Sequence, residues 1–520
     1  MNKEGIVYLV GAGPGDPGLI TVKGLECIRE ADVLVYDRLA SPDLLKEARL
    51  DAERVFVGKA SSQHTLTQDQ INKLIVDRAA DGKVVCRLKG GDPFLYGRGG
   101  EEAEELIAAG LHFEVVPGVT SAIAVPAYAG IPVTHRDLTS SFAVITGHED
   151  PNKIDSSIAW DKISTGIGTL VFLMGVENLS YIVEQLTKNG RPADTPVALI
   201  RWGTRMEQET VTGTLANIVE KVRKAKLRPP AVTIVGEVVG LRQKLRWFDN
   251  KPLFGKRVLV TRTRDQASAL SSLLRSHGAY PVEFPTIKIE PPADFAQMDA
   301  AIERLGEYDW VVFTSANGVK SMISRLASLG QDVRAFGKAK LSAIGPATAK
   351  ELTRYGLRVD LMPEEYVAQS IIDRIGDVVG KRILLPRADI AREMLVVELN
   401  KRGAMVDEVA AYRTVQVDSM DAGIVQMLND GVIDVITFTS SSTVQNFLSL
   451  LEANCELAGE NRAQWLSDLF SAVTIACIGP ITAKTAVELG LRVDIVAEDY
   501  TIPGLVEAIV ARERQREGKA

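Results

Sequence analysis

The sequence predicts an α/β protein of several domains, and three observations carry that prediction. Short apolar runs alternate with segments in which apolar residues recur at helical spacing. Residues 7–39 combine a strand, a glycine turn, a helix and a second strand, which together make a βαβ unit. Motifs in the second half of the chain return at a fixed distance. The length of 520 residues is enough for three or four compact units.

In the opening βαβ unit, glycines separate the first strand from the helix. The apolar run Val7–Val10 stops at Gly11–Gly15, helical spacing starts at Leu19, and a second strand follows at Val33–Tyr36.

The glycine turn matches a dinucleotide fingerprint only in part. Asp16 occupies the place of the last glycine, and Pro14 lacks the backbone N–H that a pyrophosphate cradle uses. A ligand without phosphate, held by backbone contacts in a tight turn, suits this stretch better. S-adenosylmethionine is one such ligand.

Two further strands of the first half run into turns of the same kind. Lys83–Leu88 leads to the turn Gly90–Pro93, and Phe113–Val116 leads to the turn Pro117–Ser121. The other predicted strands are Arg54–Val57, Ser141–Thr146, Thr169–Met174, Pro196–Trp202 and Ala231–Glu237, and helices are predicted at Thr67–Ala80 and Leu179–Asn189. Three turns at the carboxyl edge of one sheet favour a ligand site. Asp92 could accept hydrogen bonds from a cofactor's ribose or amino group, although a purely structural turn is the alternative.

Several long motifs in the first half occur together. They are GAGPGDPGLITVKG (11–24), VYDRL (35–39), VGK (57–59), GGDPFLYGRGGEE (90–102), VPGVTS (116–121), RWGT (201–204) and PPAVT (229–233). Over about residues 5–245 the chain resembles the tetrapyrrole methylases, and among them the uroporphyrinogen-III C-methyltransferases. The resemblance implies a two-subdomain methylase fold and S-adenosylmethionine as methyl donor.

The same resemblance implies roles for individual residues. Those that would line the S-adenosylmethionine pocket are Pro14, Gly90, Gly91, Asp92, Leu95, Thr120, Ser121, Met174, Gly203 and Ala231. Asp37 would be the proton acceptor and Lys59 the proton donor, since methylation of a ring carbon requires a base. Asp37 also stands where a dinucleotide fold binds ribose. Lys59 could instead pair with a propionate or cap a strand, and Leu95 and Met174 would otherwise count as core.

The second half is predicted to be two similar α/β units. Lys256–Val260 returns as Lys381–Leu385, Val312–Ser315 as Thr437–Ser440, Ile344–Lys350 as Ile478–Lys484, and Gly356–Asp360 as Gly490–Asp494. The first two pairs are about 125 residues apart and the last two about 134, so about nine residues are inserted between them.

Each unit ends strands at Thr/Ser or at Gly-Pro-x-Thr where helices begin, so hydroxyls and backbone N–H groups face one sheet edge. Two such edges would form a cleft for a polyanion, although simple helix capping is the alternative. With the segment Ala411–Thr414, this arrangement resembles uroporphyrinogen-III synthase over about residues 255–512.

The synthase resemblance also implies site residues. Tyr412 would be the acid that helps hydroxyl leave hydroxymethylbilane, unless it only packs at the domain hinge. The residues that would hold substrate carboxylates are Thr348, Ser440, Ser441 and Thr482, and Arg262, Arg387 and Arg413 are weaker candidates.

The predicted domains follow from these two resemblances. A methylase covers 1–241, with subdomains at about 1–136 and 137–241, and a linker covers 242–255. A synthase of two flavodoxin-like α/β domains covers 256–515, with one domain at about 292–410 and the other made of 256–290 and 414–515.

The expected function is bifunctional. The synthase half would cyclise hydroxymethylbilane to uroporphyrinogen III with inversion of ring D, and the methylase half would methylate that product at C2 and C7, giving precorrin-2 for sirohaem or cobalamin. One alternative is a methylase acting on another substrate, and another is a second half that only binds tetrapyrroles.

Composition narrows the remaining possibilities. The net charge of −7 argues against nucleic acid as a partner. No apolar run approaches the roughly 18 residues of a membrane span, and no signal peptide is visible, so we expect a cytoplasmic protein. The histidines lack metal spacing, and we expect no metal. The cysteines Cys27, Cys86, Cys455 and Cys477 are predicted to be free, buried thiols. The methylase resemblance implies a homodimer through that half.

Overall fold

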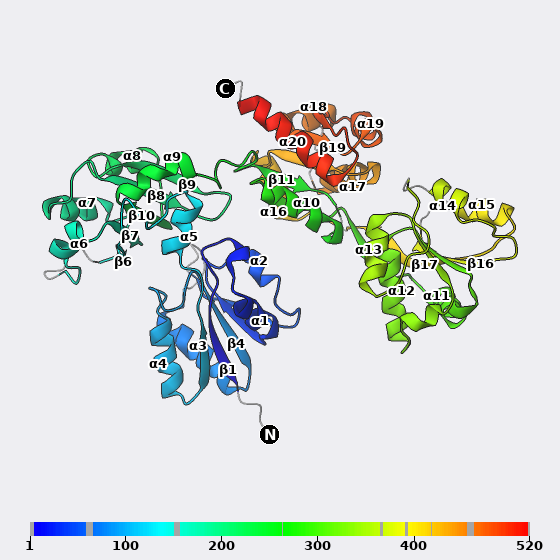
Figure 1. The fold of residues 1–520 in the computed structure, drawn as a ribbon, viewed down its shortest axis with the longest axis horizontal. Coiled ribbons are helices and arrows are strands. Elements are labelled where there is room, and N and C mark those ends of the chain that lie inside the picture. Colours follow the sequence, from blue (N-terminus) through cyan, green and yellow to red (C-terminus); the bar gives the residue numbers. More distant parts are fainter. Residues whose placement is uncertain are drawn as a thin grey trace. The chain divides into compact units, whose positions relative to one another are not determined.

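The computed structural model describes residues 5–58, 66–149, 156–262, 264–364, 368–389, 394–417, 419–454 and 462–517. They form two compact units, the first Met1–Lys256 with Arg275–Tyr280 and the second Arg257–Leu274 with Pro281–Ala520. Each unit contains two five-stranded sheets (Figure 1). Within the described ranges, no helix is long and apolar enough to cross a membrane.

The first sheet has the order β3-β2-β4-β1-β5, and its strand pairs are parallel. Its strands are β1 (Ile6–Gly11), β2 (Val33–Tyr36), β3 (Glu53–Phe56), β4 (Val84–Lys89) and β5 (His112–Val116). One face is covered by α1 (Val22–Glu30) and α2 (Pro42–Leu45), and the other by α3 (Gln68–Ala80) and α4 (Gly99–Ala108) (Figure 1). Because all strands are parallel, the turns after β1, β4 and β5 meet at one edge.

Two helices of this sheet, α1 and α3, begin after threonines that cap them. Thr67 and Gln70 form a reciprocal capping box at the start of α3, which fits the predicted helix to within a residue. α1 starts at Val22, three residues later than the predicted start at Leu19. The intervening residues form a short 3-10 turn because Asp16 accepts a hydrogen bond from the Gly18 N–H, and Thr21 then caps α1.

The second sheet is mixed, with the order β6-β7-β10-β8-β9. Its strands are β6 (Phe142–Thr146), β7 (Thr169–Leu173), β8 (Pro196–Arg201), β9 (Glu209–Thr214) and β10 (Ala231–Val235). One face carries α6 (Trp160–Gly166), α7 (Leu179–Lys188) and α8 (Ile218–Lys224), and the other carries α5 (Ser121–Tyr128) and the 3-10 helix η2 (Glu237–Leu241). The edge strand β9 was not predicted, because its sequence ETVTGT has little apolar alternation. α5 follows the third turn of the first sheet and so connects the two subdomains.

The segment 242–255 is more ordered than the predicted linker. It begins with α9 (Arg242–Leu245), and Phe248 and Leu253 are buried. The rings of Trp247 and Phe248 pack edge-on against Tyr128, with centroids 5.0 and 4.8 Å away. Burial of these aromatic side chains fastens the segment to the first unit, a packing effect that its charged sequence did not indicate.

The second unit contains two lobes, named here by chain order. The outer lobe holds the first and last segments of this half and is built on the sheet β12-β11-β18-β19-β20. The inner lobe holds the segment between them and is built on β13-β17-β16-β14-β15. The outer strands are β11 (Arg257–Val260), β12 (Tyr280–Glu283), β18 (Val435–Phe438), β19 (Thr474–Cys477) and β20 (Ile495–Val496). The inner strands are β13 (Ile287–Glu290), β14 (Trp310–Phe313), β15 (Lys340–Ala343), β16 (Arg382–Ala388) and β17 (Met405–Gln416). β13 pairs antiparallel with the end of β17, so residues 287–290 belong to the inner sheet and not, as predicted, to the outer domain.

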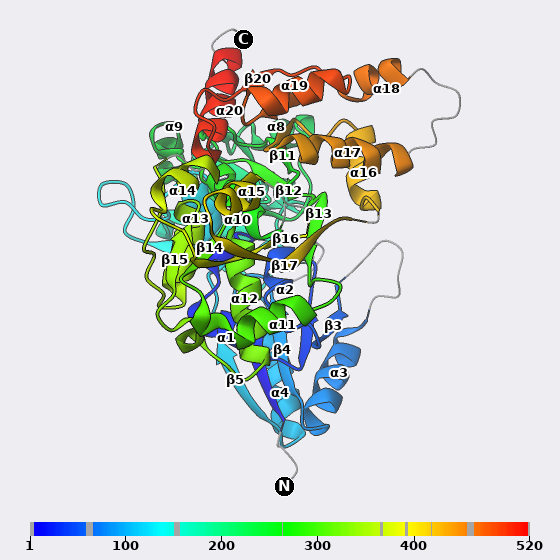
Figure 2. The same ribbon diagram turned by 90° about the vertical axis from the view of Figure 1, so that its right-hand side faces the viewer.

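Helices cover both sheets of the second unit. In the outer lobe they are α10 (Arg264–Ser276), α16 (Ala422–Asn429), α17 (Ser441–Asn454), α18 (Arg462–Leu469), α19 (Pro480–Glu488) and α20 (Ile502–Glu517). In the inner lobe they are α11 (Ala296–Glu303), α12 (Ala316–Ser328), α13 (Pro346–Arg354), α14 (Ala368–Arg374) and α15 (Met394–Lys401). α16 to α19 share one apolar core, whereas α20 packs beside β20 (Figure 2). In the inner lobe, α11 and α12 cover one face and α14 and α15 the other.

The sequence repeat is exchanged between the lobes. β11 opens the first copy, yet it pairs with β18 of the second copy, whereas β16 opens the second copy and pairs with β14 of the first. The same hydrogen bond marks both places: Asp434 Oδ2 accepts from the Arg257 N–H at 2.8 Å, and Asp309 Oδ2 accepts from the Arg382 N–H at 3.0 Å. Each lobe is therefore assembled from parts of both copies.

Candidate functional site

The three predicted turns of the first sheet come together at its carboxyl edge. The backbones of Gly13 and Gly91 exchange two hydrogen bonds, of 3.2 and 2.7 Å, which join the turns after β1 and β4. The Gly118 N–H donates to Asp92 Oδ2 at 3.0 Å, which joins the turn after β5. The edge is therefore a single assembly of backbone loops.

Glycine is required where these loops cross. A Cβ on Gly118 would lie 2.3 Å from the Gly91 carbonyl oxygen and 2.7 Å from the Gly11 Cα. A Cβ on Gly11 would lie 2.5 Å from the Gly118 Cα. All three neighbours are backbone atoms, so neither position has room for a side chain.

Asp92 organises its own turn. Its Oδ1 accepts from the N–H groups of Phe94 and Leu95, at 2.8 and 3.1 Å, while its Oδ2 accepts from Gly118. The structural alternative raised for this aspartate therefore has direct support. A carboxylate has about four acceptor sites, so the predicted contact with a cofactor stays a prediction.

The second subdomain contributes to the same edge. Thr204 Oγ1 accepts from the Asp16 N–H at 3.1 Å, and the Tyr128 hydroxyl donates to Asp16 Oδ2 at 2.7 Å. Burial, with the neighbouring carboxylate of Asp16, raises the pKa of Tyr128. The glycine turn after β1 is therefore fastened to elements of both subdomains.

Strained backbone is concentrated in a few loops of the first unit. Among the described residues, the non-glycine residues with positive φ are Tyr96, Arg98, Met174, Trp202, Thr204 and Lys226. All except Lys226 lie in loops that follow β4, β7 and β8. Bulky residues rarely adopt this conformation, and such strain concentrates at ligand-binding sites.

The remaining residues of the predicted pocket lie on both subdomains, at the start of α5, in the loop after β4, and at the ends of strands of the second sheet. Thr120 caps α5 by accepting from the Ala122 N–H, and Ser121 is the first residue of that helix. Ala231 pairs with Arg201 next to the Gly203 turn, while the following residue pairs with Leu173, just before Met174. Met174 is half exposed, unlike a core methionine, whereas Leu95 packs against the core beneath α5.

Asp37 lies at the same edge, directly after β2. Its Oδ1 accepts from the Leu39 N–H at 2.9 Å, and its Oδ2 lies 3.8 Å from Arg87 Nη2. Its side chain keeps 26% of its surface exposed. The other predicted proton-transfer residue, Lys59, lies outside the described residues.

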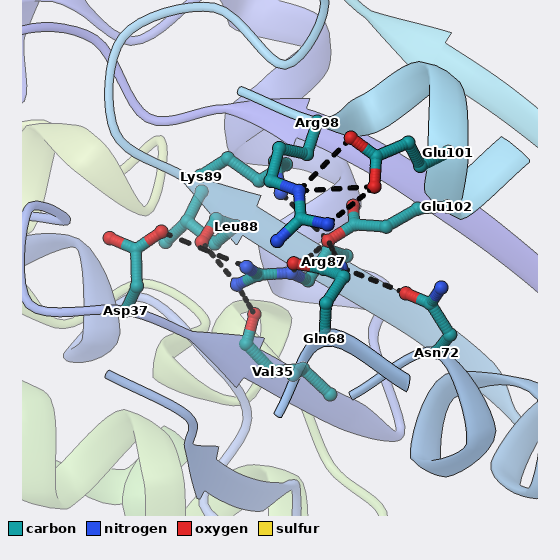
Figure 3. Close-up of polar contacts among 10 residues, drawn as sticks. All are labelled: Val35, Asp37, Gln68, Asn72, Arg87, Leu88, Lys89, Arg98, Glu101 and Glu102. Carbon is teal, nitrogen blue, oxygen red and sulfur yellow. Dashed lines mark hydrogen bonds and ion pairs between the residues drawn. The ribbon is translucent and has the colours of Figure 1, made fainter. Parts of the chain in front are cut away.

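A buried cluster of charged residues stands behind Asp37 (Figure 3). Glu102 Oε1 lies 2.7 Å from Lys89 Nζ and 3.2 Å from Arg87 Nε, and it also accepts from Gln68 Nε2 at 3.2 Å. Burial lowers the pKa of Lys89 and the charge of Arg87 lowers it further, while Glu102 opposes both effects. Sequence analysis did not single out these side chains. The signal that could have found them is the pair of charges in the apolar strand VVCRLK.

In the inner lobe, the Tyr412 hydroxyl lies 3.0 Å from Ser315 Oγ. Tyr412 is on β17 and is almost completely buried, while Ser315 follows β14 by two residues and caps α12 through the Gly318 N–H. Thr348 is buried in the first turn of α13. Sequence analysis noticed Ser315 only as part of a repeated motif.

The other predicted hydroxyls lie in the outer lobe. Ser440 Oγ accepts from the Thr443 N–H at the start of α17, and Ser441 Oγ lies 2.7 Å from Thr485 Oγ1. Thr482 is buried in the first turn of α19. The capping alternative is therefore realised for Ser440, while carboxylate binding stays a prediction for all of these residues.

The three arginines named for this half differ in surroundings. Arg387 is buried with its Nε 2.9 Å from Glu408, and Arg413 pairs with Glu290 at 3.1 Å. Burial lowers the pKa of Arg262.

Comparison with known proteins assigns the two halves separately. Residues 6–219 match the family model of the Tetrapyrrole (Corrin/Porphyrin) Methylases, and residues 268–507 match that of Uroporphyrinogen-III synthase HemD. The chain is 38% identical over 513 residues to the porphyrin biosynthesis protein HemD of Ruminiclostridium josui, covering 98% of each chain.

Two other relatives match the first half. The S-adenosyl-L-methionine-dependent uroporphyrinogen III methyltransferase of Methanosarcina barkeri (strain Fusaro / DSM 804) is 53% identical over 241 residues, which is 46% of this chain and 94% of that protein. The siroheme synthase of Pseudomonas fluorescens (strain Pf0-1) is 53% identical over 249 residues, which is 48% of this chain and 53% of that protein.

Proposed function

Because this chain belongs to the family in which a tetrapyrrole methylase is joined to a uroporphyrinogen-III synthase, we propose that it converts hydroxymethylbilane through uroporphyrinogen III to precorrin-2. The chain is an enzyme with uroporphyrinogen-III C-methyltransferase and uroporphyrinogen-III synthase activities, acting in tetrapyrrole biosynthesis. The proposal adds the two consecutive reactions, the two methylations at C2 and C7, and the use of the product for sirohaem or cobalamin.

The loop edge of the first sheet carries the methylase part of this proposal. S-adenosylmethionine, used by the Methanosarcina relative according to its name, supplies a methyl group on a positively charged sulfur. The close backbone approach at Gly91 and Gly118 suits a ligand held by main-chain contacts, and the half-exposed side chain of Met174, another residue of the predicted pocket, offers an apolar contact. The full set of proposed pocket residues is the one predicted from the sequence.

Asp37 is proposed as the base of methyl transfer. When a pyrrole carbon forms its bond to the methyl group, the carbon–sulfur bond breaks and the ring releases a proton. The Asp37 carboxylate accepts that proton, because it stands at the ligand edge and remains partly open to solvent. Lys59 is proposed as the proton donor on the resemblance alone.

Tyr412 is proposed as the acid of the synthase half. Loss of the substrate hydroxyl as water requires a proton, and the Tyr412 hydroxyl, paired with Ser315, supplies it. Thr348, Ser440, Ser441 and Thr482 are proposed to hold substrate carboxylates through their hydroxyls. S-adenosylmethionine as the only cofactor, a homodimer formed through the methylase half and a cytoplasmic location remain proposals from the sequence.

One assay tests both halves. The purified protein is given hydroxymethylbilane with and without S-adenosylmethionine, and the products are separated by chromatography and identified by absorbance and mass. We expect uroporphyrinogen III without the methyl donor and the dimethylated precorrin-2 with it. Formation of only the spontaneous type I isomer would reduce the second half to a binding module. Formation of isomer III without methylation would mean that uroporphyrinogen III is not the substrate of the first half.

A further inference from the structure

Two cations are buried in the first sheet, close to its ligand edge. Arg87 and Lys89 alternate with Leu88 on β4, so both side chains point to the face covered by α3 and α4. Each residue is 4% exposed, and Glu102, which faces them from α4, is 1% exposed. Because burying a charge is costly unless it is paired, this cluster requires a reason for its presence.

Each nitrogen of the Arg87 guanidinium faces an acceptor oxygen. Nε points to Glu102, and Nη1 donates to the carbonyl oxygens of Val35 and Leu88, at 3.5 and 3.3 Å. Nη2 is the nitrogen that lies 3.8 Å from Asp37 Oδ2 (Figure 3). The planar group therefore ties β2, β4 and α4 together directly behind the Asp37 carboxylate.

The charges of the cluster balance only when Asp37 is counted. Glu102 is shared by Arg87 and Lys89, and the nearby Glu101 pairs with Arg98 instead. From α3, the facing side chains are the neutral amides of Gln68 and Asn72, which bond to each other. Two cations thus face two carboxylates, and Asp37 is the second of them.

We propose that Arg87 is a positioning residue for methyl transfer, which orients the Asp37 carboxylate toward the substrate, and that Glu102, itself paired with Lys89, holds Arg87 in place. The inference rests on the proposed role of Asp37 as base. The geometry specifically needs arginine, since a lysine at position 87 would provide one ammonium group instead of a fixed planar fork.

A double-mutant cycle tests the inference. Asp37→Asn, Arg87→Lys and the double variant are assayed for methylation of uroporphyrinogen III, with kcat and the KM for S-adenosylmethionine measured separately. In the parent protein, Arg87→Lys is expected to lower kcat about 10–100-fold through misplacement of the base, with KM for S-adenosylmethionine unchanged. In the Asp37→Asn background, Arg87→Lys should have no further effect on kcat, because its target is absent.

Equal slowing by Arg87→Lys in both backgrounds would mean that Arg87 acts independently of Asp37, and would overturn the inference. If Asp37→Asn leaves kcat unchanged, the proposed base itself is wrong, which is a distinguishable result. If Arg87→Lys loses affinity for S-adenosylhomocysteine, Glu102→Gln replaces it in the double-mutant cycle with Asp37→Asn. Glu102→Gln removes the charge that anchors Arg87 and keeps the size of the side chain at position 102, and the same outcomes decide. Arg78→Lys is the matched control, since Arg78 pairs with Glu53 at the surface, and its kcat should stay at the parent value.

Discussion

The hydroxyl of Tyr128, at the end of α5, donates a 2.7 Å hydrogen bond to Oδ2 of Asp16 in the glycine turn after β1. These residues are 112 positions apart, and the bond links the helix that leaves the first sheet to the turn that begins it. Asp16 uses its other oxygen for the Gly18 N–H, so each carboxylate oxygen has its own donor.

Tyr128→Phe should therefore lower the free energy of unfolding of the first unit by about 1–2 kcal/mol, because Asp16 loses a partner in a partly buried site. It should also weaken S-adenosylhomocysteine binding, as the turn loses its fastening to α5. Thermal denaturation and calorimetric titration measure the two effects. Tyr181→Phe serves as the control, since Tyr181 lies on α7, which covers the opposite face of the second sheet from α5, and its ring packs edge-on against Trp160. Unchanged affinity of Tyr128→Phe for S-adenosylhomocysteine would mean that this hydrogen bond does not contribute to ligand binding.

The crossing of the glycine turns predicts a contrast between two alanine substitutions. Gly118→Ala places a methyl group against the Gly91 carbonyl and should lower the stability of the first unit by about 1–3 kcal/mol. Gly100→Ala, in α4 with open space around its Cβ position, should instead raise stability by about 0.5–1 kcal/mol. Denaturant unfolding compares the two. Equal stability of both variants would contradict the close contact.

Tyr128 and Tyr308 should ionise only at high pH. Burial and hydrogen bonds to Asp16 and Asp407 raise the pKa of Tyr128 and Tyr308, respectively. Above pH of about 10 the unfolded chain releases these protons while the folded chain retains them, so the free energy of unfolding should fall as pH rises. A near-ultraviolet tyrosinate titration should show Tyr128 and Tyr308 among the late-ionising groups, to which Tyr8 also belongs because burial raises its pKa. Tyr128→Phe and Tyr308→Phe should each remove one of them, whereas loss of an early-ionising group would contradict the assignment.

Tyr412 and Ser315 give a prediction for the synthase half. Tyr412→Phe should slow formation of uroporphyrinogen III by about 10-fold or more if the hydroxyl is the acid. Ser315→Ala should slow it less, while costing about 1 kcal/mol of stability through the lost cap of α12. Tyr355→Phe, in the same lobe, is the control and should retain the parent rate. Retention of the parent rate by Tyr412→Phe would leave Tyr412 with a packing role only.

The thiols should resist alkylation in the folded protein. Cys27, Cys86 and Cys477 are buried and free, as predicted, while Cys455 lies outside the described residues. Burial raises the pKa of Cys477 to about 12, so its reactive thiolate is scarce at neutral pH. Mass spectrometry after brief iodoacetamide treatment should find these three unmodified until denaturant is added. Labelling of Cys477 in the native protein would contradict its burial.

The sequence by itself determined the features that depend on chain neighbours. The residues of β2 were predicted from their apolar run, α3 from its helical spacing, and the repeat from matching motifs. Glycines at 11, 90, 91 and 118 indicated where backbone turns would come close to a ligand. The edge strand β9 and the packed segment after α9 were missed, because their local sequences carry little periodic signal.

Only the tertiary structure decided which residues meet across the chain. Gly11 touches Gly118, Arg87 lies between Asp37 and Glu102, and Ser315 pairs with Tyr412, although each pair is far apart in sequence. The exchange of β11 and β16 between the lobes is likewise invisible in the repeat itself. The physical reason is that turns and helices follow from local backbone preferences, whereas buried charges and strand partners are selected by packing and by the cost of leaving a polar group unpaired.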